Sequence, residues 1–141
     1  MAACLAWSCA TTPRQDTADI ALTAASINAG ATGRAILVAL GQRTQVTIVV
    51  SGVPPELVSR PVHLYTSLTG GTCAIRSSRP SYVLVDRVLA QPASSAGAVG
   101  DALTMTNVAP VPLETLRSSY AVRVATSPAD GDREIFCGEI Q

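Results

Sequence analysis

Apolar and polar residues alternate along much of the chain from residue 18 onward. In residues 19–28 (DIALTAASIN), Ile20, Leu22 and Ala24 alternate with small or polar neighbours, which is the period-two pattern of a half-buried strand. Similar runs, separated by turn-forming residues, predict seven more strands within residues 34–41, 44–55, 60–67, 81–90, 101–109, 119–127 and 133–140. Eight short strands at this spacing predict an all-β fold, either an antiparallel sandwich or a barrel.

Alternation also assigns side chains to the faces of these strands. The apolar series that share a face are Ile36, Val38 and Leu40 in the second run and Val46, Ile48 and Val50 in the third. The only helical candidate is residues 112–118 (PLETLRS), where a proline can start a single turn and Leu113 and Leu116 can pack inward.

The length and the first residues indicate one folded domain with a segment before it. A chain of 141 residues fits one domain with a sizeable core, and it contains no internal repeat. Residues 11–19 (TTPRQDTAD) are polar and show no apolar period. We therefore expect residues 18–141 to form the barrel and residues 1–17 to lie outside it as a leader and tether.

Two cysteines fall within the first ten residues, MAACLAWSCA. This apolar run is too short to span a membrane and is similar to the end of a secretory leader. Small residues before a cysteine and a polar segment after it are typical of a bacterial lipoprotein processing site. The polar segment favours Cys9 as the lipidated residue, and the preceding alanines favour Cys4. The alternatives are a plain secretory leader and an N-terminus without a targeting role. We expect the periplasm or cell envelope, with a lipid anchor as the only membrane contact.

Charge and motifs argue against several functional classes. Ten basic and ten acidic side chains cancel, so no basic face for nucleic acid is expected. The chain lacks a P-loop, a G-x-G-x-x-G motif and a G-x-S-x-G motif, and we predict no catalytic residues and no cofactor. The acids near strand ends and in loops are expected to be solvated; they are Asp86, Asp101, Asp130, Asp132, Glu134 and Glu139.

The remaining candidates for chemistry are one histidine and two cysteines. Copper and zinc sites use several imidazoles, so the single His63 favours a structural or surface role. In an exported protein, Cys73 and Cys137 are most simply a disulfide. Two buried thiols or two metal ligands are the alternatives, although two thiolates and one imidazole do not fill a four-coordinate site.

The segments PVHLYTSLTGGTCA (residues 61–74) and IFCGEI (residues 135–140) resemble the copper–zinc superoxide dismutase family. More closely, they resemble small bacterial envelope proteins that share its eight-stranded Greek-key barrel. That family has a His-x-His strand, a glycine-bearing loop that reaches a cysteine, and a Cys-Gly pair near the C-terminus. The resemblance covers residues 18–140 and implies this barrel, with a disulfide between Cys73 and Cys137.

The sequence departs from the family where the metal would bind. His63-Leu64-Tyr65 replaces the His-x-His motif, and Ala125 takes the place of the later copper histidine. Residues 73–80 (CAIRSSRP) offer no zinc ligand, and Arg133 lies one position away from the family's active-site arginine.

These departures predict a non-catalytic, metal-free envelope protein with an interaction or structural role. Its partner would be a protein or another envelope component, and its oligomeric state is left open. The alternative is a copper carrier of low coordination number that uses His63 and Tyr65, together with Met105.

Overall fold

The computed structural model describes residues 14–59, 62–84, 87–89 and 102–141. Its strands are β1 (Thr17–Ala24), β2 (Thr32–Leu40), β3 (Arg43–Ser51), β4 (Val62–Gly70), β5 (Tyr82–Val83), β6 (Arg87–Leu89), β7 (Leu103–Ala109), β8 (Tyr120–Thr126) and β9 (Glu134–Glu139). The connections contain one α-helix, α1 (Leu113–Ser119), and three 3-10 turns, η1 (Ser26–Asn28), η2 (Pro55–Leu57) and η3 (Pro128–Asp130). The predicted all-β class is confirmed, and each predicted run contains strand residues.

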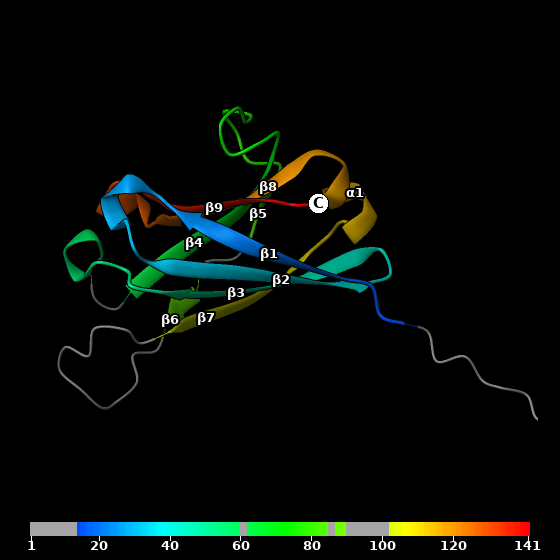
Figure 1. Cartoon of the computed structure of the whole chain (residues 1–141), viewed down its shortest axis with the longest axis horizontal. Coiled ribbons are helices and arrows are strands. Elements are labelled where there is room, and N and C mark those ends of the chain that lie inside the picture. The colour runs from blue at the N-terminus through cyan, green and yellow to red at the C-terminus, as the bar shows by residue number, and fades with distance from the viewer. Residues whose placement is uncertain (1–13, 60–61, 85–86, 90–101) are drawn as a thin grey trace, which may run out of the picture.

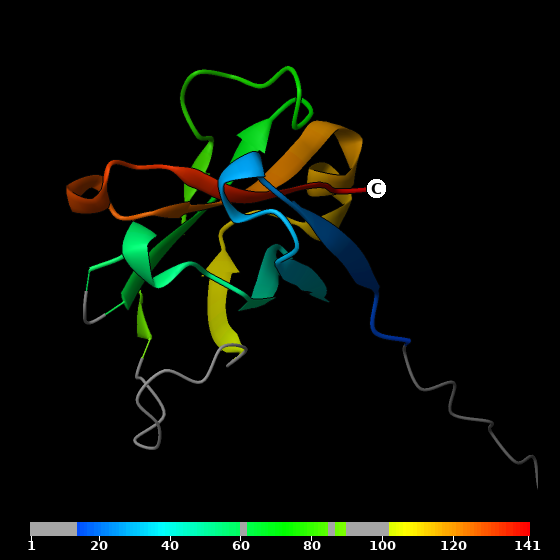
Figure 2. The same ribbon diagram turned by 60° about the vertical axis from the view of Figure 1, so that its left-hand side comes forward.

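The strands form one antiparallel sheet that curves into a nearly closed barrel (Figure 1 and Figure 2). Their order is β5–β4–β8–β9–β1–β2–β3–β7, and β6 also pairs with β4. β5 pairs with Ser67 and Leu68, whereas β6 pairs with residues 62–64 of the same strand. The two short strands therefore share one edge of β4, which leaves eight strand positions, as expected. β6 approaches β7, so the two ends of the strand order lie near each other.

β1 joins the two halves of the barrel. Its residues 17–22 pair with β2, and Thr23 and Ala24 pair with β9. Contacts with the barrel begin slightly before the expected start at residue 18. The Asp16 carbonyl accepts a 2.9 Å hydrogen bond from the Ala39 N–H, and the Asp16 carboxylate lies 2.9 Å from the Arg117 guanidinium.

Alternate strand residues fill the interior, as the period-two pattern requires. Val46, Ile48 and Val50 of β3 are all buried, which confirms the prediction for this strand. Leu113 and Leu116 of α1 are also buried, so the predicted helical turn exists and packs inward. Each such side chain contributes roughly 1.5–3 kcal/mol of transfer free energy when fully buried.

The apolar series predicted for β2 lies on the opposite face from the core. Ala35 and Leu37 are the fully buried residues, whereas Ile36 and Val38 are half-buried and Leu40 is exposed. Both faces of this strand carry apolar side chains. Alternation therefore separates the two sets but does not say which set turns inward.

Candidate functional site

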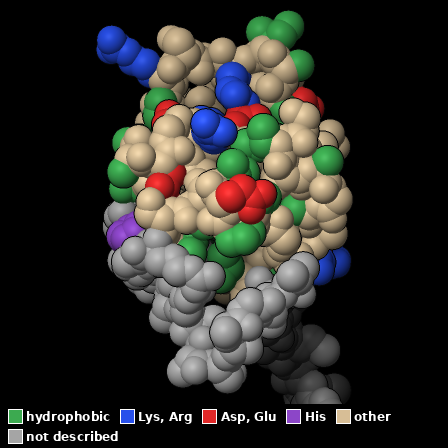
Figure 3. All heavy atoms as spheres, turned by 90° about the vertical axis from the view of Figure 1, so that its left-hand side faces the viewer, with side chains coloured by type: hydrophobic (Ala, Val, Ile, Leu, Met, Phe, Trp, Pro, Cys, Tyr) green, Lys and Arg blue, Asp and Glu red, His purple; other side chains and the backbone are tan. Residues whose placement is uncertain are grey.

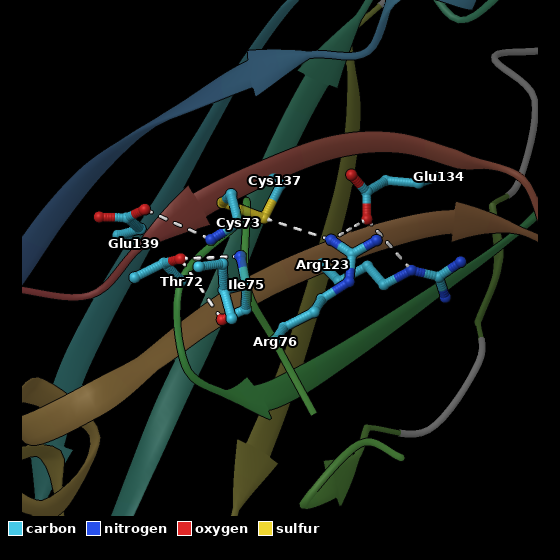
Figure 4. Close-up of a disulfide and its surroundings, with 8 residues drawn as sticks. All are labelled: Thr72, Cys73, Ile75, Arg76, Arg123, Glu134, Cys137 and Glu139. Atoms are coloured by element: carbon cyan, nitrogen blue, oxygen red, sulfur yellow. Dashed lines mark hydrogen bonds and ion pairs between the residues drawn. A yellow bond between two sulfur atoms is a disulfide. The ribbon is translucent and has the colours of Figure 1, made fainter. Parts of the chain in front are cut away.

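A disulfide joins the connection after β4 to the last strand. Cys73 and Cys137 are bonded, with their Cα atoms 5.9 Å apart and 64 positions between them in the sequence (Figure 4). Cys137 is buried in β9, and Cys73 is half-buried. The predicted pairing is confirmed, and the alternatives of two free thiols or two metal ligands are excluded for these cysteines.

The outer face of β4 is partly covered, which its sequence pattern does not indicate. Tyr65, Ser67 and Thr69 occupy alternate positions and so point to the outer face. Burial alternates only as far as Tyr65; from residue 66 to residue 69 every position is buried. Buried residues on both faces mean that another part of the chain covers this end of the strand.

The segment of residues 71–81, which we call the disulfide loop, lies against this end of β4. It starts at Gly71, whose φ is +101°, and turns back so that Gly71 forms a bridge with Arg76. The Ser77 N–H donates to the Gly70 carbonyl (3.0 Å), and the Thr72 N–H donates to the Ile75 carbonyl (2.8 Å). The loop is therefore held by backbone hydrogen bonds as well as by the disulfide.

Two arginines and two acids form an ion-pair chain beside the disulfide. The Glu134 carboxylate pairs with Arg76 of the disulfide loop and, at 3.3 Å, with Nε of Arg123 of β8 (Figure 4). Arg123 also binds the Asp132 carboxylate (3.2 Å) and donates to its carbonyl (3.0 Å). Nη1 of Arg76 lies 3.9 Å from Sγ of Cys137. The charges of these four side chains cancel one another.

A depression of about 450 Å³ lies over β4 and β8, bounded by the disulfide loop. We call it the β4–β8 hollow; its lining includes Tyr65, Ser67, Thr69, Arg76, Ser77 and Ser78. Thr69 is only 3% exposed, and among the described residues its hydroxyl has no hydrogen-bond partner. The hollow therefore brings together a guanidinium group, several hydroxyls and one buried hydroxyl that lacks a partner among the described residues.

His63 and Tyr65 share one face of β4, as predicted. Their neighbours Val62 and Leu64 are buried on the other face. Tyr65 lies directly opposite Ala125 in the β4–β8 register. Ala125, at the position where the resemblance expects a copper histidine, carries only a methyl group and lies opposite the phenol of Tyr65. Neither residue offers an imidazole.

Asp130 joins two turns at the edge of the barrel. Its carboxylate accepts hydrogen bonds from the Ser59 hydroxyl, the Ser59 N–H (3.0 Å) and the Ser127 hydroxyl (3.0 Å). The bonds from Ser59 lower the pKa of Asp130, and the charge of His63 acts in the same direction. The expectation that Asp130 is merely solvated is wrong, because it acts as a hydrogen-bond acceptor for three donors.

Met105, the third residue expected to bind copper, does not lie beside His63. Met105 is 1% exposed in the core, where its sulfur lies 4.0 Å from the Thr66 hydroxyl. Within the described residues, no group of three or more His, Cys, Asp and Glu side chains is arranged to hold a metal ion. Arg133 is exposed at the end of the β8–β9 connection.

Several predictions concern residues outside the described ranges. Cys4 and Cys9, the lipidation candidates, lie there, as do Asp86 and Asp101. In the part of the chain that is described, no helix is both long and apolar enough to cross a membrane. On one side of the molecule, basic and acidic side chains are interspersed, without a patch of one sign (Figure 3).

Arg76, Arg123 and Glu134 form a site that the sequence did not indicate. Glu134 was expected to be solvated, but its side chain is 25% exposed and lies between two guanidinium groups. One signal was present: Arg123 is a charged residue in the middle of the apolar run AVRVA, which marks an outward position near a counter-charge. Nothing local marks Arg76 among the serines of its loop.

The chain was compared with protein-family models, with curated proteins and with solved structures, and none of the three comparisons found a match.

Proposed function

We propose that this protein is a non-catalytic, metal-free member of the superoxide dismutase-like barrels of the bacterial envelope, with an interaction or structural role. The observation that carries the proposal is the pairing of Tyr65 with Ala125 on the outer face of the β4–β8 pair. A redox-active copper needs several nitrogen or sulfur ligands at one place. In the superoxide dismutase family, the positions that we match to Tyr65 and Ala125 supply imidazoles to the copper.

The strand arrangement supports the likeness. β1, β2 and β3 form a meander, the chain then crosses to β4 in the other half of the barrel, and β7 returns to the edge of β3. This connectivity is compatible with a Greek key, in which a long connection brings a later strand back beside an earlier group. The disulfide between the loop after β4 and the last strand matches the family's pattern.

The disulfide also supports an extracytoplasmic location. Bonds of this kind persist mainly in oxidising compartments such as the bacterial periplasm. With a lipid at Cys9 or Cys4, the barrel would be held at a membrane surface by the segment that precedes it. A barrel without a redox centre in that position would serve by binding another envelope component.

Metal binding and dismutase activity provide the test. Untagged protein purified from periplasm should contain substoichiometric copper and zinc by elemental analysis. Calorimetric titration with Cu(II) at pH 7.5 should show no stoichiometric site of sub-micromolar affinity, and copper-loaded protein should not remove superoxide catalytically. A tight site that disappears in His63→Ala and weakens in Tyr65→Phe would establish the copper carrier instead. Catalytic superoxide removal would reject the proposal altogether.

The interaction role needs a separate experiment. Cross-linking in intact cells, followed by purification of the barrel from envelope extracts, should yield one reproducible partner. A Cys9→Ala, Cys4→Ala variant tests the anchor, because the lipid-bearing protein should fractionate with membranes and the variant should not. Membrane fractionation that is unchanged by both substitutions would contradict lipid anchoring.

A further inference from the structure

The β4–β8 hollow has more hydrogen-bond donors than the protein itself uses. Nη1 of Arg76 pairs with Glu134, but Nε and Nη2 have no partner among the described residues. The hydroxyls of Ser67, Ser77 and Ser78 line the same hollow and likewise make no hydrogen bond within the described part of the chain. A guanidinium presents its N–H groups as a planar fork, which matches the two oxygens of a carboxylate.

Thr69 gives independent evidence that the hollow accepts a ligand. Its side chain is almost completely buried at the wall of the hollow, and its hydroxyl is unpaired in the described structure. Leaving a buried hydroxyl without a partner is unfavourable, so such groups normally bind protein, water or a ligand. Thr69 is one of the residues that line the hollow, so we expect a group bound there to give this hydroxyl its missing partner.

The acidic groups nearby do not prevent an anion from binding. Asp132 lies at the rim, where Arg123 neutralises it at 3.2 Å. Glu134 is held between Arg76 and Arg123. Arg123 uses its N–H groups on these two acids, so the unused cationic donors belong to Arg76.

From these contacts we infer that the β4–β8 hollow binds a carboxylate, with Arg76 as its charged anchor and Thr69 and the neighbouring serines as additional donors. Pro80 and the 69%-exposed Val83 give one side an apolar surface. This combination fits a small carboxylate that carries a short apolar group, either as a free acid or as the C-terminal residue of a partner. The inference goes beyond the proposed function and does not depend on the dismutase likeness, so either can fail alone.

The test uses N-acetylalanine and its uncharged amide as probes. Titration of isotope-labelled full-length protein at pH 7 and low ionic strength is followed by amide and arginine Nε chemical shifts. We expect saturable shifts at Thr69, Ser77 and Nε of Arg76 with the acid in the millimolar range, and at least about tenfold weaker binding of the amide, which lacks the charge-assisted hydrogen bonds. An N-acetylated dipeptide with a free C-terminus, compared with free propionate, separates a peptide terminus from a free acid.

Three variants locate the site. Arg76→Gln should weaken binding of the acid about tenfold, and Arg76→Lys should restore part of it because the charge returns without the planar fork. Thr69→Val should weaken it about threefold without loss of folding. Arg43→Gln removes the same charge from an exposed position in the other half of the barrel, so binding should be unchanged. Any one of three results would overturn the inference. The first is equal binding of the acid and the amide, and the second is an equal effect of the Arg76 and Arg43 variants. The third is the absence of a saturable shift up to about 50 mM acid, a concentration that corresponds to under 2 kcal/mol of binding free energy.

Discussion

Replacing Gly71 by alanine should destabilise the disulfide loop, whereas the same change at Gly70 should not. Gly71 has a φ of +101°, a conformation that L-residues rarely adopt, and a Cβ there would collide with the Ile75 carbonyl. Holding a non-glycine residue in such a region costs on the order of 1–3 kcal/mol, and the collision adds to this. At Gly70 a Cβ would meet nothing nearer than the Ser77 hydroxyl oxygen at 3.5 Å. There, alanine lowers the entropy of the unfolded chain and should be neutral or stabilising by up to about 1 kcal/mol.

Urea unfolding of the oxidised proteins measures the difference between the two variants. We expect the Gly71→Ala protein to be about 2–4 kcal/mol less stable than the Gly70→Ala protein, with similar m values. If the loop relaxes locally, amide exchange at Thr72 and Ser77 should accelerate, because their hydrogen bonds hold the turn. Equal unfolding free energies within about 0.5 kcal/mol, combined with unchanged exchange at both amides, would refute the reasoning.

Three further predictions concern stability. The double change Cys73→Ala, Cys137→Ala should lower the unfolding free energy by about 4 kcal/mol, the chain-entropy value for a separation of 64 residues; a loss below about 1 kcal/mol in urea unfolding would contradict it. Hydrogen bonding lowers the pKa of Asp130, so its stabilising contribution is present above the ordinary aspartate pKa of about 3.9 and is lost as the pH falls through the lowered value. Asp130→Asn should therefore flatten the decline in stability between pH 5 and pH 2, as measured by urea unfolding, and an unchanged decline would argue against this role. Leu64→Ala should cost about 2–5 kcal/mol because Leu64 is fully buried, while Leu40→Ala on the outer face should cost under about 1 kcal/mol; similar costs would show that the faces are misassigned.

The strands were predictable because most of them carry a local period. On β3, Val46, Ile48 and Val50 alternate with more polar residues, so one face is identified without knowledge of its neighbours. On β2 both faces are apolar, and only the position of the strand within the barrel decides that Leu37 turns inward and Ile36 outward. Element class therefore follows from local pattern, whereas the choice of face in a two-sided strand depends on tertiary packing.

The site was less predictable because long-range contacts assemble it. The cysteine pair could be predicted, since a disulfide involves only two residues of a rare type. Burial of Thr69 depends on a loop that folds back over the outer face, and no period within β4 encodes that loop. Glu134 lies between Arg76 and Arg123 only because the disulfide and the turn at Gly71 bring the loop to β9.

The pairing of β1 with β9 links the order of synthesis to the order of folding. Thr23 and Ala24 have their partners Cys137 and Phe136 in β9, so β1 lacks one neighbour until β9 has been made. Cys73 likewise cannot form its disulfide until Cys137, 64 positions later in the sequence, has been made. Contacts between such distant segments require large loops to close first, which slows folding. A nascent chain that ends before β9 cannot complete the barrel, and it stays open to proteases and chaperones until β9 emerges.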